Sequence, residues 1–212
     1  MALPMVHLIV ADEWAGSHPE YSESPEFFYG AISPDAIHIR FGNDKSRKDE
    51  FHLHNWISPH PDPVIDYWRR CHSPFDIGYG VHVLTDGQWV ERYKTCLPGL
   101  MDSDGRLDRD TYYNDTFVTD FRLYNESPRL RAIMRMIGTA ATPREHPWLT
   151  EYEFTRWREN MLDAYSKPCP KGDPVRYIDE AYVRAFVKDS LSLIEETYAR
   201  FQREKYSQNV LL

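Results

Sequence analysis

The stretch SPFDIGYGVHVLTDGQWVERY, residues 73–93, predicts a long buried helix. Ser73 followed by Pro74 is a typical helix start, because serine caps the first turn and proline fits the first helical position. Gly78 and Gly80 are small enough to let another element approach this helix closely. The stretch therefore predicts a central helix around which other elements pack.

Two polar residues lie within this apolar helix. His82 and Asp86 are four residues apart, so they lie one turn apart on the same face, and Val81 and Leu84 beside them are apolar. A buried imidazole and a buried carboxylate both need partners. They either bond each other or converge on a metal ion.

The same helix signals recur along the whole chain. Ser-Pro or Asp-Pro pairs begin several segments with helical periodicity, and alternating β-branched runs are almost absent. We predict one all-α domain spanning residues 1–212, a bundle of about eight helices. The expected helices cover 4–15, 24 to just before Pro34, 62 onward, 73–93, 107–125, 127 onward, 150–165 and 178–205, with loops at 41–50, 96–106 and 166–177.

Composition limits the classes of function. The 212-residue chain carries a net charge of −8, which disfavours stable nucleic-acid binding. Its three widely spaced cysteines do not form a disulfide framework, and its first residues do not resemble a signal peptide, so a cytoplasmic location is expected. No run of residues is long and apolar enough to predict a membrane span, and the oligomeric state is not readable from the sequence.

Histidines and aspartates with apolar neighbours gather in the first 90 residues. Imidazole and carboxylate groups are the ligands that zinc and similar divalent ions take when no thiolate is present. Each residue alone has a simpler interpretation, as a core histidine, a turn aspartate, a polar loop or a hydrogen-bonded pair. Together they favour a metal site, and the candidates are His7, Asp35, His52, His54, His82 and Asp86.

The other histidines have different surroundings. They lie mostly beside proline, serine or charged residues, which predicts loop or surface positions for His18, His38, His60, His72 and His146.

The order of four motifs resembles the zinc-dependent phospholipase C family. These motifs are the N-terminal helical histidine His7, then FFYGAISPDAIHIR, then KDEFHLH, then GYGVHVLTDGQW. The resemblance covers roughly residues 5 to 125 and is closest to short bacterial members. It implies the all-helical fold that this family shares with single-strand-specific zinc nucleases.

The resemblance also implies roles for individual residues. His82 and Asp86 match the H-x-x-x-D helix, where both side chains bind metal and the aspartate can bridge two ions. Asp35 matches the aspartate of the G-x-x-x-P-D turn, which is a ligand or the residue that orients the water, so Asp35 is the candidate catalytic base. His52 matches the next histidine, with His54 as the alternative.

A second ion is implied by His7, which matches the N-terminal helical histidine. The family pattern is incomplete in this chain, because the N-terminal tryptophan amine and the downstream His, His and Glu ligands have no match. One or two zinc ions, or another divalent metal, are therefore expected. Asp115 and Asp120 lie on a predicted helix that either completes the site or simply carries polar positions.

These observations predict a metal-dependent phosphoester hydrolase that uses metal-activated water on a small-molecule or lipid substrate. Arg40 and Lys45 either meet the anionic substrate or are solvated loop charges. One alternative is an HD-type phosphohydrolase, although the sequence contains no adjacent His-Asp pair. The other is a non-catalytic helical binding protein with a structural or vestigial metal site.

Overall fold

The computed structural model describes residues 2–42, 44, 46–55, 59–169 and 171–209. Within these ranges the chain is helical, and its one β-type contact is an isolated bridge between Met101 and Leu107. The α-helices are α1 (Pro4–Ala15), α2 (Pro19–Ser22), α3 (Pro25–Gly30), α4 (His38–Phe41), α5 (Lys48–Phe51), α6 (Pro61–Arg70), α7 (Pro74–Cys96), α8 (Arg109–Glu126), α9 (Pro128–Thr139), α10 (Glu151–Ser166) and α11 (Glu180–Asn209). Two 3₁₀ helices, η1 (Pro34–Ile37) and η2 (Pro98–Leu100), complete the order.

The helix starts follow the sequence signals. Ser24, Ser73 and Ser127 each accept a hydrogen bond from a backbone N–H of the first turn, and each is followed by proline. Ser73 forms a full capping box with Asp76, whose side chain accepts from the Ser73 backbone N–H. The Ser-Pro pairs therefore begin helices because cap and proline together satisfy the exposed first turn.

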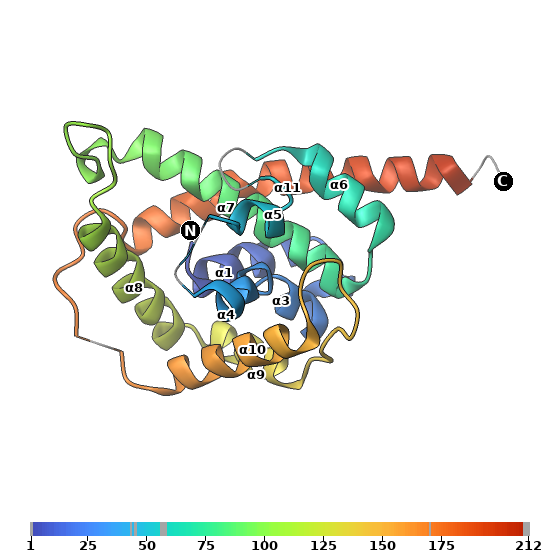
Figure 1. Cartoon of the computed structure of the whole chain (residues 1–212), viewed down its shortest axis with the longest axis horizontal. Helices are drawn as coiled ribbons and strands as arrows, with labels where there is room; N and C mark the ends of the chain where they lie inside the picture. The colour runs from blue at the N-terminus through green and yellow to red at the C-terminus, as the bar shows by residue number, and fades with distance from the viewer. Residues whose placement is uncertain (1, 43, 45, 56–58, 170, 210–212) are drawn as a thin grey trace.

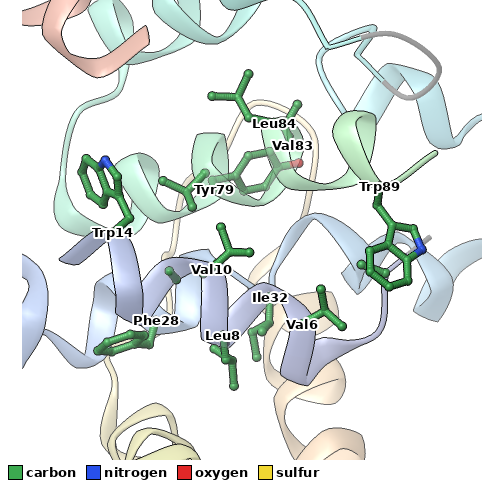
Figure 2. Packing of buried hydrophobic residues seen from close by; sticks show 14 of the residues in the cluster. Val6, Leu8, Val10, Trp14, Phe28, Ile32, Tyr79, Val83, Leu84 and Trp89 are labelled. Atoms are coloured by element: carbon green, nitrogen blue, oxygen red, sulfur yellow. The ribbon is translucent and has the colours of Figure 1, made fainter. Parts of the chain in front are cut away.

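Helix α1 lies in the middle of the molecule. It contacts α7, α8, α9 and α11, while α11 also packs on α6 and α7 (Figure 1). The buried apolar side chains of α1, α3 and α7 belong to one hydrophobic core, and Figure 2 labels Leu8, Val10, Phe28, Tyr79 and Leu84 among them. The buried polar residues His7, His82 and Asp86 of these helices are therefore enclosed by this apolar core.

The crossing of α3 and α7 brings two backbones into contact. A Cβ atom on Gly78 would lie 2.0 Å from the carbonyl oxygen of Phe27, and one on Gly30 would lie 2.0 Å from that of Phe75. Gly80 is similarly covered by the indole of Trp68. No other residue fits at Gly30 or Gly78 without moving backbone, so these two glycines let α3 approach α7. The sequence predicts such a close approach by another element at Gly78 and at Gly80.

Asp115 and Asp120 are buried on α8 and bind backbone groups. Asp115 accepts hydrogen bonds from the backbone N–H groups of Arg176, Tyr177 and Ile178, just before α11. Asp120 accepts from the N–H of Met5 at 3.0 Å, and from the hydroxyl of Tyr165. Both side chains therefore hold other segments in place, and neither is in the one group of potential metal ligands among the described residues, which favours the polar-position alternative.

The all-helical fold is confirmed, but the expected number of helices is too small. The chain forms eleven α-helices in the described ranges, where about eight are predicted, because α2, α4 and α5 are single turns too short to show periodicity. Part of the expected loop 41–50 is helical for this reason, since α5 begins at Lys48. Nowhere in the described residues does a helix combine the length and apolar character needed to cross a membrane.

Replacing Gly78 with alanine tests the α3–α7 crossing. We expect Gly78→Ala to lower the free energy of unfolding by at least about 3 kcal/mol, because the new Cβ meets rigid backbone rather than a flexible side chain. Urea unfolding followed by circular dichroism measures this change. The matched control is Gly138→Ala in α9, where the nearest atom is a Leu162 methyl at 3.7 Å and alanine stabilises the helix by up to about 1 kcal/mol. Equal stability of the two variants would refute the close crossing.

Candidate metal centre

Four side chains from three parts of the chain converge at one buried point. Asp35 comes from η1, His52 directly follows α5, and His82 and Asp86 lie one turn apart on α7. Each is at most 3% exposed, and one potential ligand atom from each lies within 4.8 Å of the others. These four residues, here called the quartet, could hold a metal ion.

The crossing of α3 and α7 orients the ring of His82. Its Nδ1 lies 2.8 Å from the carbonyl oxygen of Ala31, the residue that follows α3. A carbonyl only accepts, so Nδ1 carries a hydrogen, and Nε2 is the ring nitrogen that faces away from this contact. That Nε2 faces Asp86 Oδ2 at 3.7 Å and Asp35 Oδ1 at 4.0 Å, and it has no hydrogen-bond partner.

His52 is oriented in the same manner. Its Nδ1 lies 3.1 Å from the carbonyl oxygen of Lys48, while its Nε2 lies 3.3 Å from Asp86 Oδ2 and 3.6 Å from Asp35 Oδ1. An imidazole that donates through one nitrogen to a backbone carbonyl and presents the other is the usual arrangement of a metal-binding histidine. Both histidines of the quartet therefore present Nε2 toward the same two carboxylate oxygens.

A lysine ammonium also lies against these two oxygens. Lys48, at the start of α5, is 1% exposed, and its Nζ lies 2.7 Å from Asp35 Oδ1 and 3.0 Å from Asp86 Oδ2. Burial alone would raise the pKa of each carboxyl, but the Lys48 charge, together with the neighbouring histidine side chains, outweighs it. The pKa values of Asp35 and Asp86 therefore lie well below the usual range, and both groups are ionised.

His7 occupies the opposite side of Asp86. Its ring stacks on that of His82, with centroids 3.7 Å apart and planes 7° from parallel. Its Nε2 lies 3.4 Å from Asp86 Oδ1, which also accepts a hydrogen bond from the Ala2 N–H at 3.0 Å. Burial, with the nearby His82 next in size, lowers the pKa of His7 to about 4, so this imidazole is neutral at pH 7. Asp86 thus directs Oδ1 toward His7 and the Ala2 N–H, and Oδ2 toward Lys48 and His52.

Several residues that the sequence suggests lie away from this point. His54 is 73% exposed at its side chain and lies 3.0 Å from Asp49, so the geometry selects His52 over His54. Arg40 is held by Glu153 of α10, with the closer contact at 2.6 Å, and does not act as a loop charge near the quartet. Lys45 is outside the described residues. The simpler interpretation of Asp35 as a helix cap also fails, because its Oδ1 bonds Lys48 rather than a backbone N–H.

Two neighbours of the quartet are missing from the sequence prediction. Lys48 is one of several basic residues in a mixed-charge segment, and only its position four residues before His52 indicates that the two share a helical face. His38, expected at the surface, has only 15% of its side chain exposed. Its Nδ1 lies 2.7 Å from the Gly42 carbonyl oxygen, and its buried Nε2 lies 3.9 Å from Asp35 Oδ1. It is thus the partly exposed residue at the edge of the site.

Comparisons with known proteins add no relative to this description. No protein-family model, no curated protein and no solved structure matches the chain. The case for a function therefore depends on the motifs and on the geometry of the quartet.

His146 is in a loop, as expected, and it is partly buried. Its ring packs against the aromatic side chains of Tyr79, Trp148 and Phe154, and its Nε2 lies 3.2 Å from the Tyr67 hydroxyl. Burial lowers the pKa of His146 to about 4, against an ordinary value of 6.5. The folded protein therefore holds this histidine in its neutral form down to about pH 4.

This lowered pKa predicts a pH-dependent stability. Between pH 6.5 and about 4 the unfolded chain protonates His146 and the folded chain does not, so stability falls as the pH falls through this window. We expect the wild type to lose up to about 1.4 kcal/mol per pH unit more than His146→Gln, because the other titrating groups contribute equally to both. Urea unfolding at several pH values measures the difference. His72→Gln, at an exposed histidine, should follow the wild type, and parallel curves for wild type and His146→Gln would contradict the assignment.

Proposed function

We propose that the chain is a zinc-dependent phosphoester hydrolase with the all-helical fold of the zinc-dependent phospholipase C family. The observation that carries this proposal is the pair of imidazoles, His52 and His82, each anchored through Nδ1 to a backbone carbonyl and facing two ionised carboxylates. The motif order supports the same family. Both arguments point to the quartet without relying on each other.

The donor set fits a divalent ion of the zinc type. Two imidazole nitrogens and two carboxylate oxygens form a common four-ligand set, and tetrahedral bonds of 2.0–2.2 Å place ligand atoms roughly 3.3–3.6 Å apart. The nitrogen–oxygen distances in the quartet run from 3.3 Å to 4.0 Å, and all four ligand atoms lie within 4.8 Å of one another, so the side chains would have to move closer together to reach this geometry. When bound, such an ion supplies Lewis-acid chemistry, lowering the pKa of water from 15.7 to about 7 and polarising a phosphoryl oxygen.

The candidate residues have different roles in the proposed reaction. His52, His82, Asp35 and Asp86 would hold the ion, and Asp35, whose Oδ1 lies 3.9 Å from Nε2 of the partly exposed His38, is also the candidate base. Asp86 directs Oδ2 into the quartet and Oδ1 toward His7. A second ion would be held by Asp86 and by His7, whose imidazole is already neutral.

Substrate would approach beside His52. A surface groove of about 460 Å³ is lined by Leu53 and His54, the two residues that follow this ligand, together with Glu50, Asp62, Pro63, Asp66, Arg70 and Trp148. Leu53 and His54 both have positive φ, 55° and 56°, a conformation that costs of order 1 kcal/mol for each such residue and is typical of functional sites. The bend they form turns the chain away from the quartet immediately after His52.

The HD-type alternative is disfavoured by spacing. That class uses adjacent histidine and aspartate on one helix, whereas His82 and Asp86 are a full turn apart. The non-catalytic alternative is favoured by one specific feature, the Lys48 ammonium, which already supplies a positive charge to the two carboxylates.

Metal binding is tested by a pair of neighbouring histidines. We expect His52→Ala to lose most of the zinc bound by the wild type, because it removes one of four ligands, while His54→Ala retains it. Elemental analysis of protein purified without chelator, followed by a zinc titration, gives the stoichiometry of each. His82→Ala should behave like His52→Ala. Equal zinc content in His52→Ala and the wild type would show that the quartet is not the zinc site.

Catalysis is tested at Asp35. The zinc-loaded protein should hydrolyse an activated phosphodiester such as bis(4-nitrophenyl) phosphate, with the activity abolished by chelator and restored by zinc. Asp35→Asn keeps the shape and removes the charge, so we expect a loss of about 100-fold or more. Asp163→Asn, at an exposed aspartate of α10 paired with Lys167, should keep full activity. A zinc-loaded wild type that is inert on lipid, nucleotide and small diesters would favour the binding-protein alternative.

A further inference from the structure

The position of Lys48 raises a question about how a metal ion enters the site. Its ammonium contacts Asp35 Oδ1 and Asp86 Oδ2, and these are the same two oxygens that face the Nε2 atoms of His52 and His82. An ion held by the quartet would therefore share both of its carboxylate ligands with the lysine. Both carboxylates and the ammonium are buried, so solvent does not screen them from one another.

Charge balance makes this sharing unfavourable. Asp35 and Asp86 bring two negative charges and Lys48 one positive charge, which leaves a single negative charge in the metal-free site. A divalent ion added beside the ammonium would reverse the sign of the buried charge and place two cations on the same oxygens. Removal of the ammonium from the oxygens avoids this repulsion, and the four-carbon stem of lysine allows the movement.

We infer that Lys48 is a built-in competitor of the metal ion, which holds the quartet together when metal is absent and must leave Asp35 and Asp86 when a divalent ion binds. This inference rests on the metal site of the proposed function and adds its regulation. The lysine weakens metal binding by the free energy needed to displace it. It also keeps the two carboxylates from repelling each other in the metal-free protein.

Lys48 could instead have the opposite role and support metal binding. A lysine that stayed in place and bonded the bound carboxylates from outside would orient the ligands, and its removal would weaken metal binding. The two roles therefore predict opposite changes in zinc affinity when Lys48 loses its charge.

The experiment compares zinc binding by metal-free wild type, Lys48→Met, Lys48→Gln and Arg47→Met, using a competing chromophoric chelator at one pH. We expect both Lys48 variants to bind zinc at least tenfold more tightly than the wild type. Arg47→Met removes the same charge one residue away, at an exposed side chain paired with Glu50, and should stay within about twofold of the wild type. Unchanged or weaker binding by both Lys48 variants overturns the inference.

Stability gives a second measurement. Lys48→Met leaves two buried carboxylates without their cation, so its metal-free melting temperature should fall, and zinc should raise it by more than in the wild type. If metal-free Lys48→Met is unfolded, zinc should refold it, as seen by circular dichroism. Failure to refold, together with no gain in affinity in Lys48→Gln, also overturns the inference.

The outcomes separate this inference from the proposed function. If the wild type shows zinc-dependent hydrolysis but the Lys48 variants bind zinc no more tightly, the proposed hydrolase function stands and the proposed role of Lys48 is wrong. If only the Lys48 variants bind zinc, the proposed role of Lys48 stands and the proposed metal-dependent activity of the wild type is wrong. Absence of zinc binding in every variant overturns both. Adding His82→Ala to Lys48→Met should cancel the gain, which places the ion in the quartet.

Discussion

Two ionised carboxylates, Asp35 and Asp86, are buried side by side, and the surrounding structure is organised to compensate them. A carboxylate removed from water is stable only when it is paired and hydrogen-bonded. Asp35 and Asp86 share the Lys48 ammonium, and Asp86 also accepts from the Ala2 N–H. These groups come from η1, α7, α5 and the residues before α1, so the electrostatic requirement ties together segments that are far apart in the sequence.

Helix packing delivers these groups to one point. The close crossing of α3 and α7, where Gly30 lies against the Phe75 backbone and Gly78 against that of Phe27, brings the Ala31 carbonyl against His82. This hydrogen bond determines which ring nitrogen faces the carboxylates. On the other side, Asp120 of α8 binds the N–H of Met5 at the start of α1, the helix that carries His7. The chemistry of the site is therefore set by backbone contacts some distance from it. A substitution at either contact would disturb the site without touching a candidate ligand.

The sequence predicts those parts of this arrangement that depend on local rules. Ser-Pro starts mark helices because capping is local, and His82 and Asp86 share a face because helical spacing is local. The choice between His52 and His54 depends on a bend with two positive φ values, which no neighbouring residue type reveals. Lys48 is buried because of tertiary packing against Asp86, which is far along the chain. Asp115 likewise accepts from the segment before α11, whose residues are tens of positions away. Periodicity does not detect such contacts.

The charge of the site also bears on the class of substrate. With Lys48 displaced, a divalent ion neutralises Asp35 and Asp86, and the ammonium becomes available near a neutral centre; with Lys48 retained, the centre carries one positive charge. In both states the positive charge in excess of the two carboxylates is one, so it matches a singly charged phosphodiester better than a doubly charged phosphomonoester. A second ion at His7 and Asp86 would add two further positive charges and reverse this preference. For the proposed hydrolase, the number of bound ions, rather than the shape of the groove beside His52, would thus separate diesterase from monoesterase chemistry.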